Sequence, residues 1–130
     1  MRMYSFNQNN LSNSIQPEDI AKLLRSVGAS GRLIGFNYLV HIVYNILQKP
    51  DEHYWITKCA YPDTAKYFHV RPASVEHAIR TVIGACWERN DHSDLDRVAG
   101  IKLENMPTNS EFIDILVAYL HYGSYERRGK

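Results

Sequence analysis

The chain has 130 residues, of which 45% are hydrophobic, and its formal net charge at pH 7 is +1. This length suffices for one continuous core and is too short for two ordinary domains, and without a long apolar run we expect neither a membrane-spanning helix nor a signal peptide. A charge so near zero excludes a uniformly basic surface, so any nucleic-acid contact depends on where the cations lie. We therefore expect a single soluble domain in the cytoplasm.

Order is expected to begin at Gln16. The preceding residues 1–15 are rich in Asn, Ser and Gln, so we expect them to be a flexible lead-in. Pro17 suits the first position of a helix, and an apolar stripe with helical spacing follows as far as Gly28. The stripe consists of Ile20, Leu23, Leu24 and Val27.

A second helix is predicted after the turn bracketed by Gly31 and Gly35. Apolar residues then recur every three or four positions until Pro50, which cannot continue a helix. These residues are Leu39, Ile42, Val43, Ile46 and Leu47. Residues 55–60 are predicted to form a short helical piece that stops before Pro62.

Two prolines open the next pair of predicted helices. The first helix runs from Pro62 to Phe68, and after a break at residues 69–71 the second runs from Pro72 to about Arg89. Its apolar face consists of Val75, Ala78, Ile79, Val82, Ile83 and Cys86, and its opposite face of Ala73, Glu76, His77, Arg80 and Gly84. This order is the plan of a helix-turn-helix, whose second helix enters the major groove of DNA.

The C-terminal third is predicted to hold a short helical segment at residues 95–98 and a longer final helix. Thr108 and Glu111 have the T-x-x-E spacing of a capping box, ahead of apolar residues at helical intervals. Residues 123–130 form a basic tail that we expect to be mobile. Because neither strand-like alternation nor a repeat occurs, the predicted class is all-α, with one domain over residues 16–122.

The outward face of the helix that begins at Pro72 carries side chains that match base edges. The guanidinium of Arg80 can fork onto guanine O6 and N7, Glu76 can accept from cytosine N4, and His77 can donate to a purine N7. Phosphate or flanking contacts are expected from Lys58, Lys66, Arg71, Ser74, Thr81 and Arg89.

The same residues admit a plainer interpretation. Glu76 and Arg80 are four positions apart, so they can form a solvated ion pair on an ordinary surface helix. Gly84 makes the helix about 1 kcal/mol less stable than Ala would. Close approach of DNA would explain a glycine at this position, and so would drift at an unimportant position. The pattern alone leaves both interpretations open.

Three strings of the sequence are distinctive: YPDTAKYF at residues 61–68, VEHAIR at residues 75–80 and PTNSEFI at residues 107–113. With them, the stretch from about Ile20 to Leu120 resembles the C-terminal effector domain of the stage-zero sporulation master regulator of spore-forming Firmicutes. The resemblance implies a six-helix domain, related to winged-helix-like effector domains without a clear wing, that binds a promoter element as tandem copies.

The resemblance also implies roles for individual residues. Base reading falls to Glu76, His77 and Arg80, and contact with RNA polymerase sigma factor to residues 90–102, with Asp94, Asp96, Arg97 and Lys102 as candidates. The family usually has Arg in place of His77 and a basic residue in place of Ser74, so DNA affinity or sequence preference is expected to differ. It also carries a phosphoacceptor receiver domain before the effector domain. This chain offers only a short lead-in there, so we expect no control by its own phosphorylation.

The main prediction is therefore a DNA-binding transcriptional regulator that associates with the nucleoid when bound. The alternative is a protein-binding module with weak DNA readout that modulates the full-length regulator or sigma factor. A DNA binder should lose affinity steeply with salt and discriminate between base sequences, whereas a protein module should not.

Catalytic, metal and cofactor functions find no support. The six histidines, at positions 41, 53, 69, 77, 92 and 121, lack metal-ligand spacing, and no nucleophile elbow or phosphate loop occurs. Cys59 and Cys86 are expected to be reduced core residues. We expect neither an enzyme nor a cofactor.

Some histidine and tyrosine side chains also have an expected location. His41 is expected to edge the core and His92 to be a solvated loop residue. Tyr119 is expected to finish the core, although Tyr119, Tyr122 and Tyr125 are also of the type that forms self-association surfaces.

Overall fold

The computed structural model describes residues 15–49 and 59–129, and side chains as far as residue 122. In chain order the α-helices are α2 (Pro17–Ser26), α3 (Ile34–Gln48), α4 (Tyr61–Phe68), α5 (Pro72–Glu88), α6 (Ser93–Ala99) and α7 (Asn109–Gly129), and a 3₁₀ turn, Arg89–His92, follows α5. The all-α prediction is confirmed for the described residues. Of the predicted lead-in, only Ile15 lies among the described residues, and it is buried. Of the helical piece predicted at residues 55–60, only residues 59 and 60 are described.

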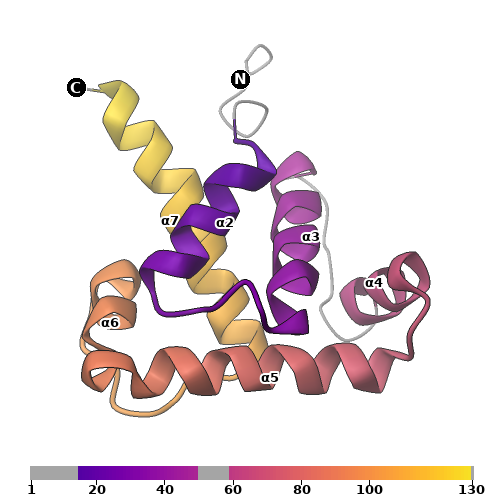
Figure 1. Ribbon diagram of the computed structural model, residues 1–130. Helices are drawn as coiled ribbons and strands as arrows, with labels where there is room; N and C mark the ends of the chain where they lie inside the picture. The colour runs from indigo at the N-terminus through magenta and orange to yellow at the C-terminus, as the bar shows by residue number, and fades with distance from the viewer. Residues whose placement is uncertain (1–14, 50–58, 130) are drawn as a thin grey trace.

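Helix α5 forms one side of the molecule (Figure 1). Helices α3 and α7 pack against it, and α2 packs against α3; α4 lies at the beginning of α5 and α6 beside its end. Among the described elements α5 contacts α3, α4, α6 and α7. No described helix is long and apolar enough to cross a membrane.

The local sequence explains where the helices begin and end. The backbone N–H of Gln16 donates to the Asp19 carboxylate at 2.8 Å, which caps α2, and Gly28 follows the helix with a left-handed φ of 109°. The capping box before α7 is confirmed in both directions: the N–H of Thr108 donates to Glu111 Oε1 at 2.9 Å, and the N–H of Glu111 donates to Thr108 Oγ1 at 3.1 Å.

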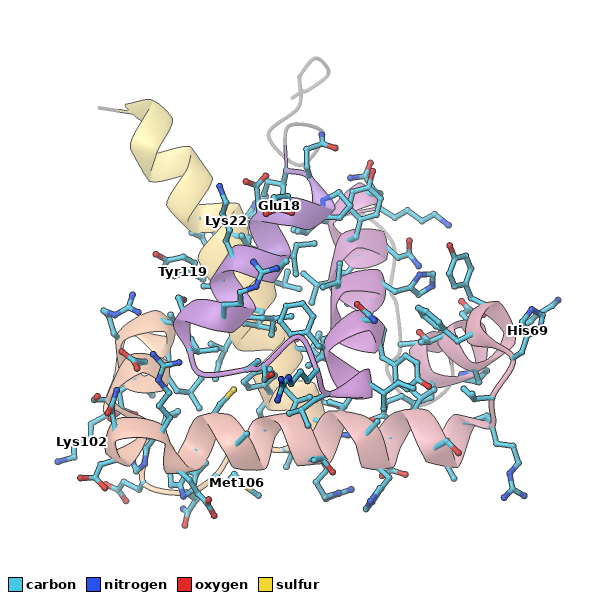
Figure 2. The ribbon with its side chains drawn as sticks, viewed as in Figure 1. Glu18, Lys22, His69, Lys102, Met106 and Tyr119 are labelled. Carbon is cyan, nitrogen blue, oxygen red and sulfur yellow. The ribbon has the colours of Figure 1, made fainter. Side chains whose placement is uncertain are left out.

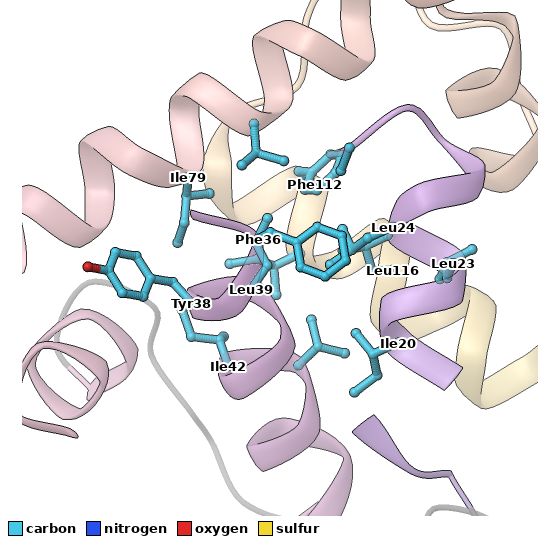
Figure 3. Close-up of a cluster of buried hydrophobic side chains, with 14 of the residues drawn as sticks. Ile20, Leu23, Leu24, Phe36, Tyr38, Leu39, Ile42, Ile79, Phe112 and Leu116 are labelled. Carbon is cyan, nitrogen blue, oxygen red and sulfur yellow. The ribbon is translucent and has the colours of Figure 1, made fainter. Parts of the chain in front are cut away.

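The core lies where α2, α3, α5 and α7 meet (Figure 3). The buried face of α5 consists of the six predicted residues, from Val75 to Cys86. The largest fully buried side chains come from all four helices and include Ile20, Leu24, Leu39, Ile42, Ile79, Phe112 and Leu116. Tyr119 is 37% exposed, so the expectation that it finishes the core is wrong; Leu116 and Leu120 do so.

Gly35 allows α3 to contact α5 backbone to backbone. A Cβ at this position would collide with the carbonyl group of Ala78. The sequence predicted Gly35 only as the edge of a turn, because the partner lies on a distant helix. The absence of a side chain brings the beginning of α3 against the first half of α5.

Candidate nucleic-acid interface

A tight corner joins α4 to α5. His69 ends α4 in the left-handed region, with φ 60° and ψ 45°, and the N–H of Val70 donates to the Ala65 carbonyl at 2.9 Å. Arg71 then takes an extended conformation, and Pro72 opens α5. The corner falls at the predicted break, although nothing in the sequence singled out His69 for a positive φ. It sets a short helix against the beginning of a longer one, as the pattern predicted.

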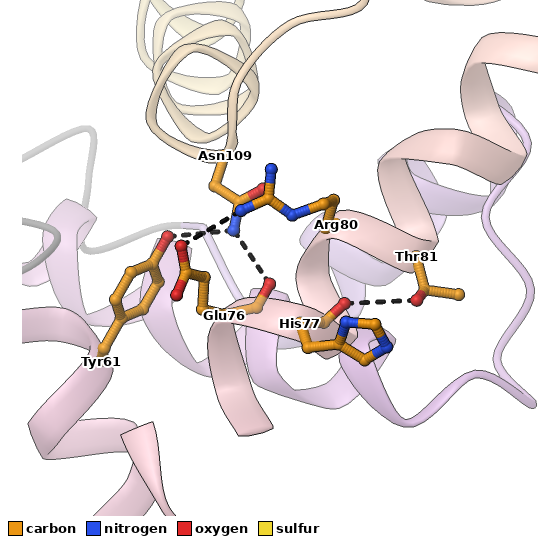
Figure 4. A network of polar contacts seen from close by, with 6 residues as sticks. All are labelled: Tyr61, Glu76, His77, Arg80, Thr81 and Asn109. Carbon is orange, nitrogen blue, oxygen red and sulfur yellow. Dashed lines mark hydrogen bonds and ion pairs between the residues drawn. The ribbon is translucent and has the colours of Figure 1, made fainter. Parts of the chain in front are cut away.

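The residues expected to read bases lie together on the outward face of α5 (Figure 4). His77 and Arg80 are exposed and Glu76 is half-buried. Arg80 Nη2 donates to Glu76 Oε2 at 3.1 Å, and their side chains are 57% and 47% exposed. The surface ion pair of the plainer interpretation is thus present. An exposed pair of this spacing contributes only about 0.3–0.5 kcal/mol, so it can open at little cost when a base edge competes for either partner.

An apolar groove borders one side of this face. It lies between the beginning of α3 and the first half of α5, has a volume of about 580 Å³, and includes Ser74, His77 and Thr81 from α5 in its lining. Ile34, also in the lining, is 62% exposed. The hydroxyl of Thr81 donates to the His77 carbonyl at 3.2 Å. No sequence pattern predicted this groove, because its two walls are distant along the chain.

The side chain of Asn109 borders the other side of the face. It is only 6% exposed, and its Nδ2 donates both to the Tyr61 hydroxyl and to the Glu76 carbonyl, each at 3.0 Å (Figure 4). One amide therefore joins α7, α4 and α5. Burial raises the pKa of the Tyr61 hydroxyl above its ordinary value, although the Asn109 hydrogen bond opposes the shift. Composition and spacing did not indicate this contact, since the partners of Asn109 are 33 and 48 residues away.

The cations expected to contact phosphates are dispersed. Lys66 and Arg71 are exposed near the α4–α5 corner, and Lys58 lies outside the described residues. Arg89 is at the far end of α5 and is engaged within the protein: Nη1 donates to the Arg25 carbonyl at 3.4 Å, and Nε lies 3.7 Å from Asp94 Oδ2.

A comparison with known protein families identifies the family of the domain. Residues 20–120 match the family model described as sporulation initiation factor Spo0A C terminal. The chain belongs to this family. The match begins in α2 and ends within α7, so it includes α4, α5 and Asn109. Spo0A C-terminal domains are DNA-binding effector domains of a sporulation regulator, and the family is regulatory rather than enzymatic.

The segment after α5, to which the resemblance assigns a polymerase contact, has its acidic side chains engaged locally. Asp94 accepts from Asn90 Nδ2 at 3.3 Å, and Asp96 accepts the N–H of Leu103 at 3.0 Å. Arg97 and Lys102 are exposed. Two exposed apolar residues that sequence reasoning missed, Ile101 and Met106, lie in the loop after α6; Figure 2 shows Met106 and Lys102 at this end of the molecule.

His92 is not the solvated residue that the sequence predicted. Its ring stacks on Trp87 with centroids 3.6 Å apart and an interplanar angle of 4°. The 3₁₀ turn reaches this stack through Asn90, Asp91 and His92, which all have φ between 51° and 53°. No local pattern indicates three consecutive left-handed residues without glycine, because each is unfavourable alone.

Both cysteines lie among the described residues, and neither belongs to a cluster of titratable groups there. Cys86 is buried and Cys59 is half-buried, both as free thiols, and burial raises the pKa of the Cys86 thiol to about 12. Within the described parts of the chain, no three His, Cys, Asp or Glu side chains gather as a metal site requires.

Proposed function

We propose that this chain is a sequence-specific transcriptional regulator that reads base edges with the outward face of α5. Helices α4 and α5 act as the two helices of a helix-turn-helix in the six-helix effector domain, which extends over residues 16–122. The observation that carries the proposal is the division of α5. Its inward face is buried in the core, while Glu76, His77 and Arg80 share the outward face.

Each residue of that face has a distinct role in the proposal. Arg80 reads guanine, Glu76 reads cytosine and His77 reads a purine N7. Lys66 and Arg71 contact phosphates beside the corner, with Ser74 and Thr81 at the flank of the reading face. Arg89, which is engaged with Arg25 and Asp94, is not proposed as a phosphate contact.

Fluorescence anisotropy with two duplexes tests the proposal. One duplex carries the promoter element of the family and the other carries it scrambled. We expect specific binding to be at least ~100-fold tighter. Arg80→Ala should lower specific affinity by ~10- to 100-fold and leave nonspecific affinity nearly unchanged, because a bidentate base contact carries ~1–3 kcal/mol of discrimination.

Lys22→Ala is the matched control, because it removes the same charge from an exposed position on α2 (Figure 2). It should leave the ratio of the two affinities unchanged. Equal binding of both duplexes by the unaltered protein would contradict the proposal.

We also propose a polymerase contact at the other end of α5. Arg97 and Lys102 supply its charge, and Ile101 and Met106 supply apolar area; Asp94 and Asp96 hold the segment in shape. A pull-down with purified sigma factor should weaken with Arg97→Ala and remain unchanged with Lys22→Ala. Tandem binding of two copies is proposed from the family, and sedimentation on a duplex with two adjacent elements checks it.

A second candidate function is favoured by the apolar groove. A groove lined by Leu33, Ile34 and Tyr38 beside the reading face suits a protein segment as well as it suits DNA. In that case the chain modulates the full-length regulator or sigma factor and reads DNA weakly. Binding that is insensitive to base sequence, together with loss of a protein complex in Ile34→Asp, would favour this function.

A further inference from the structure

We propose that Asn109 is a positioning residue for DNA recognition: its amide fixes α5 against α4 and α7 so that Glu76 and Arg80 face the bases. This inference rests on the proposed function. It concerns a nearly buried side chain at the border of the face that is proposed to contact bases. The group of three residues joined by the amide, Asn109, Tyr61 and Glu76, is called the Asn109 clamp below.

The Asn109 amide uses both of its hydrogen-bond donors within the protein. A side-chain amide has two N–H donors, and Nδ2 of Asn109 uses them on acceptors from two different helices, both at 3.0 Å. Asn109 is 6% exposed and the Tyr61 side chain is 8% exposed, so water does not readily replace either partner. The contact therefore holds the three helices at one mutual distance.

The clamp holds α5 at the position of the proposed reading face. The acceptor is the main-chain carbonyl of Glu76, the residue whose side chain pairs with Arg80 one turn later. Rotation or sliding of α5 along its neighbours would break this bond and would carry the reading side chains with it. Burial is the main cause of the raised pKa of Tyr61, and the charges of Glu76 and Arg80 act on it in opposite directions.

The beginning of α7, which bears Asn109, is held in place by its own contacts. The reciprocal hydrogen bonds of Thr108 and Glu111 fix the beginning of α7. Phe112 and Ile113, which follow, are fully buried. Asn109 is therefore fixed relative to the core, and its hydrogen bond fixes α5 relative to the core in turn.

The test separates positioning from stability. Asn109→Ser and Asn109→Ala remove the clamp, and Thr108→Ala removes the neighbouring cap while leaving the clamp residues intact. All are compared with the unaltered protein by anisotropy on the specific and scrambled duplexes, at a temperature where circular dichroism shows each variant to be folded. The measured quantity is the ratio of the two affinities.

We expect the Asn109 variants to lower this ratio at least ~10-fold, while scrambled-duplex affinity changes less than about twofold, because phosphate contacts tolerate a displaced helix better than base contacts do. Thr108→Ala, which loosens the arm that bears Asn109, should lower the ratio less than the Asn109 variants do. Ile20→Val is the stability control: it leaves a small cavity in the core at α2, so it should lower the melting temperature and keep the ratio. Tyr61→Phe, which loses one hydroxyl in a buried position, should lower the ratio about threefold.

Retention of the ratio in the Asn109 variants, while Arg80→Ala abolishes it, would overturn the positioning role and leave the proposed function intact. If the Asn109 variants do not fold, Tyr61→Phe decides in the same way. An unaltered protein without any preference would instead refute the proposed function, and the positioning role with it.

Discussion

Two glycines illustrate how differently the same residue is used in this fold. Gly35 lies against the backbone of α5 at Ala78, where no Cβ fits. Gly84 lies within α5, and an added Cβ would meet nothing within 4 Å. A methyl group should therefore have opposite effects on the free energy of unfolding at these positions.

We predict that Gly35→Ala lowers the free energy of unfolding by about 1–3 kcal/mol or more, because α3 and α5 must separate. Gly84→Ala should raise it by up to about 1 kcal/mol, because Ala favours the helix and no clash opposes it. Urea denaturation of both variants measures the difference. A neutral Gly35→Ala would mean that α3 and α5 do not approach as closely as described.

The position of the proposed reading residues on the outward face of α5 was predictable from the sequence, whereas their surroundings were not. Helical periodicity alone placed Glu76, His77 and Arg80 opposite the apolar stripe. Arg89 was expected to contact phosphate, and the sequence could not indicate its partners within the protein because they depend on the tertiary fold: the Arg25 carbonyl is 64 residues away.

The contact between α3 and α4 depends on a small aromatic group. His41 of α3 packs against Tyr67 with centroids 4.4 Å apart and against Phe68 at 5.5 Å, and Asn45 Nδ2 lies 3.1 Å from its Nε2. Burial lowers the pKa of His41, and the nearby Asp63 carboxylate opposes the shift. His41 is half-buried, at the edge of the core as expected.

This shift makes the stability of the protein depend on pH. Because the folded pKa of His41 lies below the unfolded value, the unfolded chain binds more protons between the two values. The stabilising contribution is complete above about pH 6.5 and is lost as the pH falls through the folded pKa.

We therefore predict that the melting temperature falls between pH 7.5 and pH 5, and falls less in His41→Phe, which keeps the ring packing and cannot titrate. Thermal denaturation followed by circular dichroism at both pH values gives the comparison. The difference between the two proteins isolates His41 from the other histidines. Equal losses in both would exclude this residue as the source.

Helices were predictable from the sequence to the extent that their causes are local. The stripe of α5, its proline start and the Thr108–Glu111 cap each depend on residues within a few positions of one another. The Asn109 clamp and the apolar groove join segments distant along the chain. The sequence around the groove residue Ile34 indicates only the beginning of a helix and nothing about its exposure in a groove.

The distribution of charge predicts how DNA binding responds to salt. With a net charge of +1 and with Lys66 and Arg71 as the proposed phosphate contacts among the described residues, few counterions should be released on binding. We expect log K to fall with log salt with a slope of about −2, which is shallow for a DNA-binding protein. Arg71→Ala should reduce the slope by about one, and Lys22→Ala should not change it. A slope much steeper than −2 would show that further cations contact the DNA.

The straight run of α5 has a consequence for promoter architecture. The helix contains 17 residues and therefore spans about 25 Å, with the reading face in its first half and α6 beside its end. In the proposed complex that distance corresponds to roughly seven base pairs of B-form DNA. The length of α5 would then set both the distance between the binding element and the polymerase and the side of the double helix on which the element lies. Inserting half a helical turn of DNA between the element and the polymerase site would therefore silence the promoter, even though the element is still fully occupied.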